Sequence, residues 1–117
     1  MNAQELREAL TPLQEKKGYF FNAKDPGLVS QLLEKLLVNR QRYGHMACPC
    51  RLACGDKEID RDIICPCVYR EADVAQFGTC YCGLYASREW NDGKVPERLV
   101  PERRPADKTL AALIGSS

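Results

Sequence analysis

The feature that most constrains this chain is a set of three Cys-X-Cys pairs in its middle. They read CPC at 48–50, CPC at 65–67 and CYC at 80–82, and the seventh cysteine, Cys54, stands outside them. Fourteen residues separate the first pair from the second, and twelve separate the second from the third. This spacing differs from the C-x₂-C pairs of common zinc ribbons and from the C-x₂-C-x₂-C run of bacterial ferredoxins. Because proline fixes the backbone and removes an N–H donor, the two CPC loops are expected to be rigid.

The rest of the sequence indicates the cellular compartment of the protein and excludes some classes of partner. The first residues, MNAQELREAL, contain acidic side chains and lack the apolar segment of a signal peptide, so a cytoplasmic protein is expected. In a reducing compartment, cysteines serve as metal ligands or redox catalysts more often than as structural disulfides. The 17 basic and 16 acidic side chains nearly cancel, which argues against nucleic acid as a partner. No apolar run approaches the ~20 residues needed to cross a bilayer, so no membrane partner is expected.

Two kinds of metal centre fit the number of cysteines. A cubane iron–sulfur cluster takes four thiolates, which leaves two of the six paired cysteines for one redox disulfide. A tetrahedral zinc site would also take four thiolates and would leave three of all seven. The count fits a cluster with a redox dithiol but does not exclude zinc, so an iron–sulfur disulfide reductase and a structural zinc module that binds a partner protein both stay open here. A third interpretation keeps the cluster as a simple one-electron carrier.

The cysteines also divide the chain into three parts. The length of 117 residues is that of one domain. All cysteines lie within 48–82, which leaves a scaffold over 1–45, a cysteine centre over 46–86 and a C-terminal tail over 87–117. The scaffold has helical periodicity, so we expect a mostly α, small single-domain protein.

The first helix of the scaffold is expected over residues 2–18. Its leucines recur at helical spacing, and Gly18 is a helix-stop residue. Pro12 leaves open a kink or a division into two short helices. Phe20 and Phe21 then belong to a link between helices and are expected to pack inward.

The second helix, over 25–44, has the clearest signals in the chain. Asp25 can cap its first turn, Pro26 suits that turn, and Gly44 can end the helix. Its apolar residues form a continuous stripe, which predicts a core-facing surface. They are Leu28, Val29, Leu32, Leu33, Leu36 and Leu37.

Shorter elements are expected around and after the cysteine pairs. Charged stretches predict short helices over 56–62 and 71–77. The segment 83–90 fits either a strand or a helix, since its periodicity does not decide between them. Residues 91–105 contain three prolines and indicate turns and extended chain, and 106–115 predict a terminal helix or a frayed end.

The pattern of CPC, CPC and CYC, entered from RYGHMACPCR and left through CGLY, resembles the catalytic subunit of ferredoxin–thioredoxin reductase. It is most similar to the single-chain forms of anaerobic archaea and bacteria. The resemblance implies a mostly helical, disc-like oxidoreductase with a cluster-binding centre that holds a 4Fe–4S cluster. Ferredoxin would donate electrons at one face, and a thioredoxin-like protein would be reduced at the other. The plant-type enzyme also has a variable subunit, which stays open as a further partner.

The resemblance also implies a role for each paired cysteine. Cys50 and Cys82 would form the active-site disulfide, with Cys50 as the exposed nucleophile and Cys82 held against the cluster. The four remaining paired cysteines would ligate the cluster: Cys48, Cys65, Cys67 and Cys80.

The third pair departs from the plant-type enzyme, which has histidine where this chain has Tyr81. A phenol, with a pKa of about 10, moves protons less readily at neutral pH than an imidazole does. Tyr81 is therefore expected to donate a hydrogen bond to a cysteine sulfur. His45, the only histidine, is a candidate for part of the proton role, with a polar end of the long helix as its alternative.

Other residues near the pairs allow two interpretations each. Arg51 and Arg70 either lower the pKa of a thiol or are ordinary surface arginines. Cys54 is either a bystander thiol packed as a small apolar side chain or a resolving cysteine for a mixed disulfide with Cys50. The basic residues of the tail form either an entry face for an acidic ferredoxin or a solvated surface. They are Arg88, Lys94, Arg98, Arg103 and Arg104.

Overall fold

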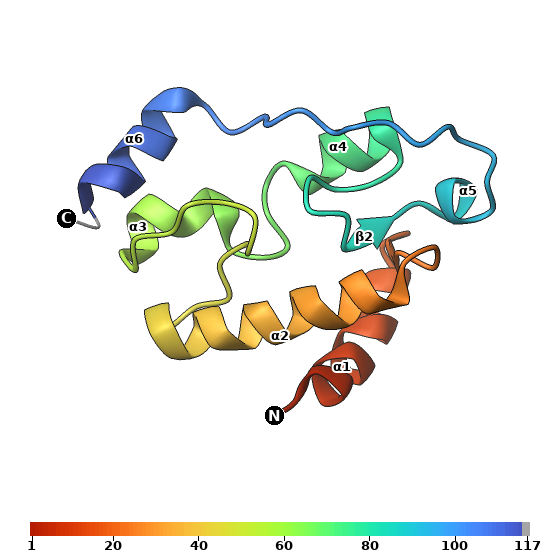
Figure 1. Cartoon of the computed structure of the whole chain (residues 1–117), viewed down its shortest axis with the longest axis horizontal. Helices are drawn as coiled ribbons and strands as arrows, with labels where there is room; N and C mark the ends of the chain where they lie inside the picture. The colour runs from red at the N-terminus through yellow and green to blue at the C-terminus, as the bar shows by residue number, and fades with distance from the viewer. Residues whose placement is uncertain (116–117) are drawn as a thin grey trace.

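In the computed structural model, which describes residues 1–115, the chain forms six α-helices and one two-stranded sheet (Figure 1). The helices are α1 (Ala3–Glu15), α2 (Pro26–Tyr43), α3 (Lys57–Asp60), α4 (Arg70–Phe77), α5 (Arg88–Asn91) and α6 (Ala106–Gly115). A 3₁₀ turn, η1 (Arg61–Ile63), follows α3, and the strands are β1 (Phe20–Phe21) and β2 (Tyr85–Ala86). The molecule is flattened, with extents of 43 × 32 × 23 Å. The expectation of a small, mostly α protein is confirmed. Over the same residues, no helix has both the length and the apolar character required to cross a bilayer.

The N-terminal helix α1 is a single helix in spite of its proline. It begins at a capping box, in which the Asn2 side chain accepts the Glu5 N–H while the Glu5 side chain accepts the Asn2 N–H. Pro12 lies inside the helix, which continues to Glu15. The considered division into two short helices is therefore wrong.

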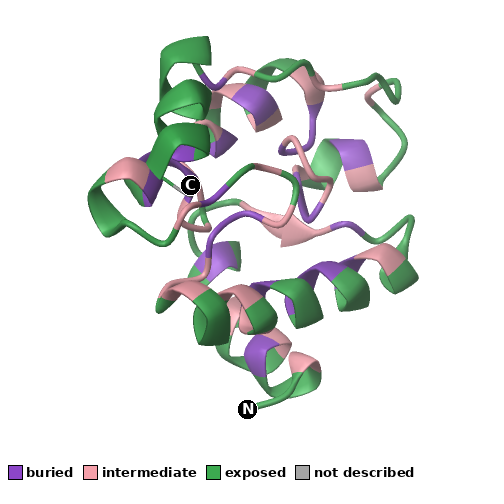
Figure 2. Ribbon diagram, turned by 60° about the vertical axis from the view of Figure 1, so that its left-hand side comes forward, coloured by how far each residue is buried: buried purple, intermediate pink, exposed green. Residues whose placement is uncertain are grey.

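Helix α2 follows the sequence prediction closely. The Asp25 carboxylate accepts the Leu28 N–H at 3.0 Å, and Gly44 ends the helix in the left-handed region with φ of 84°. One face is buried along its length, whereas the opposite face is exposed (Figure 2). The buried residues of this face pack with Leu6 of α1 and with the segment that contains Cys80 and Tyr85. They are Val29, Leu32, Leu33 and Leu36.

The small sheet joins two segments that are far apart in the sequence. β1 and β2 are antiparallel, with Phe20 opposite Ala86 and Phe21 opposite Tyr85, and the rings of Phe21 and Tyr85 stack at 5.4 Å. The residues expected to be a link are therefore a strand. The ambiguous segment 83–90 contains both β2 and the start of α5. This pairing fixes the third cysteine pair relative to the N-terminal scaffold.

An extended segment over 94–105, which we call the C-terminal strap, runs from α5 past α4 to α6 (Figure 1). Its arginines bond to the body of the molecule: Arg98 to the Gln76 carbonyl, Arg103 to Asp73 and Arg104 to Asp62. The Arg104 side chain is only 1% exposed and also donates to the Leu52 and Ile59 carbonyls. Arg104 thus belongs to the interior and to neither of the two basic surfaces considered for it.

The turn after α4 places a glycine against a buried tryptophan. Gly78 has φ of 89°, and a Cβ at this position would lie 2.5 Å from Trp90 Cδ1. We expect Gly78→Ala to lower the free energy of unfolding by about 3 kcal/mol. Left-handed backbone costs an L-residue about 1–2 kcal/mol, and overpacking adds about 1–3 kcal/mol. Chemical denaturation measures the difference.

Gly93→Ala is the matched control for this variant. Gly93 also has a positive φ, of 77°, but no atom lies within 4 Å of its would-be Cβ. Its replacement should cost only the backbone part, about 1–2 kcal/mol. Equal losses in the two variants would show that contact with Trp90 contributes nothing.

Candidate active site

Backbone pairing brings the first two cysteine pairs side by side. The Cys48 N–H donates to the Ile63 carbonyl at 2.8 Å, and the Cys65 N–H donates to the Met46 carbonyl at 2.8 Å. These bonds surround an antiparallel bridge between Ala47 and Ile64. The segments 46–48 and 63–65, which lead into the two CPC loops, are antiparallel and are fixed to each other by these bonds.

The third pair reaches the same place through a tight loop before β2. The Cys80 N–H donates to the Tyr85 carbonyl, and the Gly83 N–H donates to the Cys80 carbonyl, both at 3.0 Å. Cys80 is buried and belongs to the same apolar cluster as the inner face of α2. The position of this cysteine is thus set by the main core of the protein.

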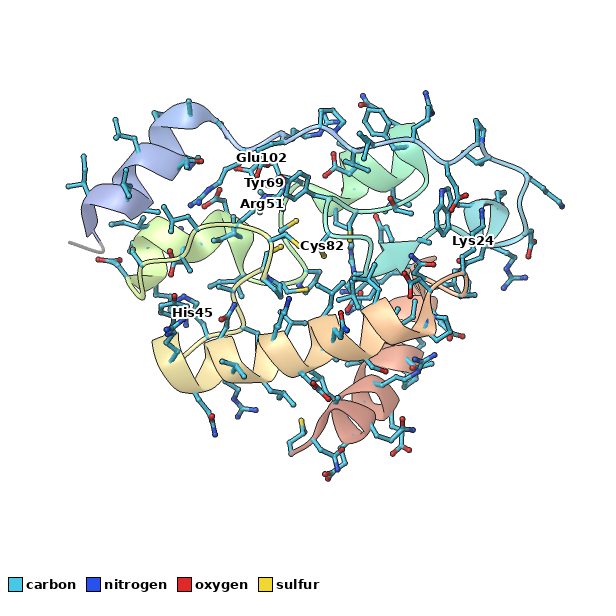
Figure 3. The ribbon with its side chains drawn as sticks, viewed as in Figure 1. Lys24, His45, Arg51, Tyr69, Cys82 and Glu102 are labelled. Carbon is cyan, nitrogen blue, oxygen red and sulfur yellow. The ribbon has the colours of Figure 1, made fainter. Side chains whose placement is uncertain are left out.

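Five of the six paired cysteines line one small cavity, and the sulfurs group in the middle of the molecule near Cys82 (Figure 3). The lining residues are Cys48, Arg51, Cys65, Pro66, Cys67, Arg70, Cys80, Tyr81, Cys82 and Tyr85. All four cysteines predicted as cluster ligands are among them. Cys50 is exposed and is not part of the lining, and Cys82 Sγ lies 3.7 Å from Cys80 Sγ. Cys54 is not part of the lining.

Backbone N–H groups favour the thiolate form of three of the four predicted ligands. The Tyr85 N–H donates to Cys80 Sγ at 3.3 Å. The pKa of Cys48 is raised by the Cys50 thiol and that of Cys67 by burial, and the N–H groups of Cys50 and Tyr69 act in the opposite direction. Such donors stabilise a sulfur that carries negative charge, as a metal-bound thiolate does.

The donor set fits an iron–sulfur cluster. The four cysteines predicted as ligands offer soft sulfur donors to one cavity, and the positively charged Arg51 and Arg70 line the same cavity. Within residues 1–115, no group of three or more His, Cys, Asp or Glu side chains is placed to hold a single metal ion. The Cys65–Pro66 peptide bond in the middle pair is cis.

The two cysteines predicted to form the disulfide differ in pKa. Hydrogen bonds from Cys48 and Cys82 lower the pKa of Cys50 to about 3. Hydrogen bonds to Cys48 and Cys50, together with burial, raise the pKa of Cys82 well above its ordinary value. In the reduced state, these two directions favour ionisation of the exposed Cys50 over ionisation of Cys82.

Arg70 is a buried residue and the side chain of Arg51 is buried, so the surface alternative is wrong for both arginines. The Arg51 side chain is 1% exposed, and its Nη1 donates to Cys67 Sγ at 3.3 Å. Arg70 lies over the Tyr19 ring at 3.8 Å and donates to the Gln14 side chain. No local sequence signal distinguished these two arginines from surface residues.

The two residues considered for proton transfer occupy different places. Tyr81 lines the cavity, with the Arg51 guanidinium 4.6 Å from its ring centre. His45 lies outside the cavity lining, and its Nε2 is 2.8 Å from the buried Asp60 carboxylate (Figure 3). Asp60 also accepts the Cys54 N–H, and the Cys54 thiol is 3.5 Å from it. The structure brings Tyr81 to the site and holds His45 and Cys54 together elsewhere.

These features define a class of small helical proteins in which paired cysteines surround one central cavity. The chain matches the family of the ferredoxin thioredoxin reductase catalytic beta chain over residues 2–104, and it belongs to this family. The resemblance stated from the cysteine motifs is thereby confirmed. The family is one of oxidoreductases that connect ferredoxin with thioredoxin. Helix α6 lies beyond the matched residues, and no curated protein matches the sequence.

Proposed function

We propose that this chain is an iron–sulfur disulfide reductase that uses electrons from ferredoxin to reduce the disulfide of a thioredoxin-like protein. One observation carries the proposal: the cysteines assigned to the cluster line a single cavity, with Cys82 among them and Cys50 exposed. Membership of the family supports the choice of ferredoxin and thioredoxin as partners.

The proposed ligands of the cluster are the four cysteines Cys48, Cys65, Cys67 and Cys80. A bound 4Fe–4S cluster would supply electrons singly beside the disulfide, which needs two. The chain itself fixes the sulfurs through the backbone bridge at Ala47 and the loop before β2. The N–H donors on three of the sulfurs would stabilise the ligands as thiolates.

The reaction proposed for Cys50 and Cys82 balances as follows. Their disulfide accepts two electrons and one proton and becomes the Cys50 thiolate and the Cys82 thiol. The Cys50 thiolate then attacks the substrate disulfide, which forms a mixed disulfide and releases one substrate thiolate. The Cys82 thiol passes its proton to this substrate thiolate and attacks the Cys50 sulfur, which closes the Cys50–Cys82 disulfide again and releases the second substrate thiolate, which takes a proton from solvent. The exposure of Cys50 and the position of Cys82 on the cavity support this division.

The electron donor proposed here has enough driving force. A plant-type ferredoxin has a potential of about −400 mV, and a thioredoxin disulfide has one of about −270 mV. The difference of ~130 mV corresponds to roughly 6 kcal/mol for two electrons. Two successive ferredoxin molecules can therefore reduce one thioredoxin disulfide.

The source of the protons is proposed from position. Tyr81 lines the cavity, next to Cys82 in the sequence, whereas His45 contacts Asp60 outside that lining. We therefore propose Tyr81 as the source of the protons, because it lines the same cavity as Cys82. A role for His45 in proton transfer stays a prediction. Because His45 contacts Asp60 and not the cavity, a proton from His45 would have to pass through Asp60 and the loop that follows Cys54.

Anaerobic purification followed by thiol counting tests the proposed function. We expect a brown protein with about four irons per chain, which gains two alkylatable thiols, at Cys50 and Cys82, on two-electron reduction. Cys82→Ser should accumulate a mixed disulfide between Cys50 and thioredoxin, because no second thiol resolves it.

The same experiment separates the other candidate functions. A colourless protein loaded with zinc would contradict the proposal and favour the structural zinc module. A brown protein that gains no thiols would be a one-electron carrier. Turnover by the purified chain alone, compared with turnover after addition of a candidate second subunit, decides whether such a subunit is needed.

A further inference from the structure

A buried arginine connects the cysteine centre to the C-terminal strap. Arg51 leaves the first CPC loop, and its guanidinium lies over the rings of Tyr69 and Tyr81, at 5.0 and 4.6 Å from their centres. Its side chain is 1% exposed. An arginine so enclosed has little freedom to turn away from its partners.

The nitrogens of the Arg51 guanidinium donate hydrogen bonds to two different partners. Nη1 donates to Cys67 Sγ at 3.3 Å. Nε and Nη2 donate to the Glu102 carboxylate at 2.9–3.1 Å, in a fork that only arginine provides (Figure 3). The bond to the strap therefore sets the direction in which Nη1 points.

Glu102 is itself held in place. Its Oε1 accepts the Arg104 N–H at 2.8 Å, and the Arg104 side chain forms a buried ion pair with Asp62 at 2.9 Å. The Tyr69 hydroxyl donates to the same Asp62 carboxylate at 2.6 Å. Asp62 therefore anchors both neighbours of Arg51. It bonds directly to Tyr69, and it holds Glu102 through Arg104.

We infer that Arg51 is a positioning residue that raises the reduction potential of the centre bound through Cys67, and that Glu102 of the strap holds it in that position. A hydrogen-bond donor and a positive charge beside a ligand sulfur stabilise the more negative, reduced state. The inference rests on the proposed cluster function. It adds that the strap, which contributes no cysteine, helps to set the potential at which electrons enter.

A potential titration of the anaerobically purified full chain, followed by visible absorbance, tests this inference. Arg51→Gln should shift the midpoint to a more negative value than that of the wild type. Arg51→Lys, which keeps the charge but loses the fork, should shift it part of the way. Arg61→Gln is the control, because Arg61 is 75% exposed and its loss changes the net charge equally. Its midpoint should equal that of the wild type.

A double-mutant cycle tests the role of Glu102 independently of its own charge. In a Glu102→Gln background, Arg51→Gln should shift the midpoint less, because the guanidinium is no longer held against Cys67. An equal shift in both backgrounds would overturn the holding role of Glu102. A midpoint unchanged by Arg51→Gln would overturn the inference entirely.

Failure of the inference can be told apart from failure of the proposed function. If the wild-type chain binds no cluster, its iron content shows this before any titration, and both proposals fall. If only Arg51→Gln loses the cluster, Arg51→Lys and Glu102→Gln decide, because the first keeps the positive charge and the second keeps Arg51 itself. A midpoint equal to the wild type in Arg51→Lys would then contradict the role given to the fork.

Discussion

Replacing Cys50 with serine is expected to lower ferredoxin-linked disulfide reduction by at least about a thousandfold, since loss of a nucleophile removes the step that forms the covalent intermediate. A serine hydroxyl does not ionise near neutral pH, whereas Cys50 is exposed and has a low pKa. The bound iron should be unchanged, because Cys50 is not a proposed ligand. Turnover with reduced ferredoxin and thioredoxin, together with iron analysis, measures both effects.

Cys54→Ser provides the matched control for this variant. The same atom is exchanged four positions further on, but Cys54 is outside the cavity lining and its thiol contacts Asp60. Full turnover is expected, and a loss would instead support a resolving role for Cys54. A Cys50→Ser protein that kept more than about a tenth of wild-type turnover would contradict the assignment of Cys50 as nucleophile.

Replacing Cys80 with serine is expected to lower the iron content from about four per chain to less than about one. Cys80 is a proposed ligand, its sulfur accepts the Tyr85 N–H, and the residue is buried in the main apolar cluster. The melting temperature should fall as well, because binding of a metal centre contributes directly to folding free energy. Iron analysis and thermal denaturation under argon measure these changes.

Cys54→Ser again serves as the reference, since it also exchanges sulfur for oxygen in a partly buried position. It should retain both the colour and the melting temperature of the wild type. Full iron content in Cys80→Ser would remove Cys80 from the ligand set and would reopen the assignment of the three remaining ligands.

Helix α2 could be predicted in detail because its signals are local. Asp25 caps it, an apolar stripe follows at helical spacing, and Gly44 ends it in a conformation that favours glycine. The grouping of the cysteines could also be anticipated, since three Cys-X-Cys pairs in a small chain have few other uses. Which sulfur serves which role came from the family resemblance and not from spacing.

Other features depended on contacts between distant segments, and the sequence did not reveal them. β1 is two residues long and becomes a strand only because β2 lies beside it. Arg51 and Arg104 looked like surface residues, but Glu102 and Asp62 hold them in the interior. His45 lies three positions before Cys48, yet its ring contacts Asp60 instead of the cavity. In each case the partner that decides the outcome comes from another part of the chain.

The location of Cys80 in the apolar cluster of α2 has a practical consequence for anyone who engineers this chain. The packing of leucines remote from any chemistry determines where one proposed ligand lies. A library randomised along the inner face of α2 could therefore be sorted by eye, since pale colonies would mark misplaced sulfur. Pigment retention would serve as a visible gauge of side-chain packing, without any assay of catalysis.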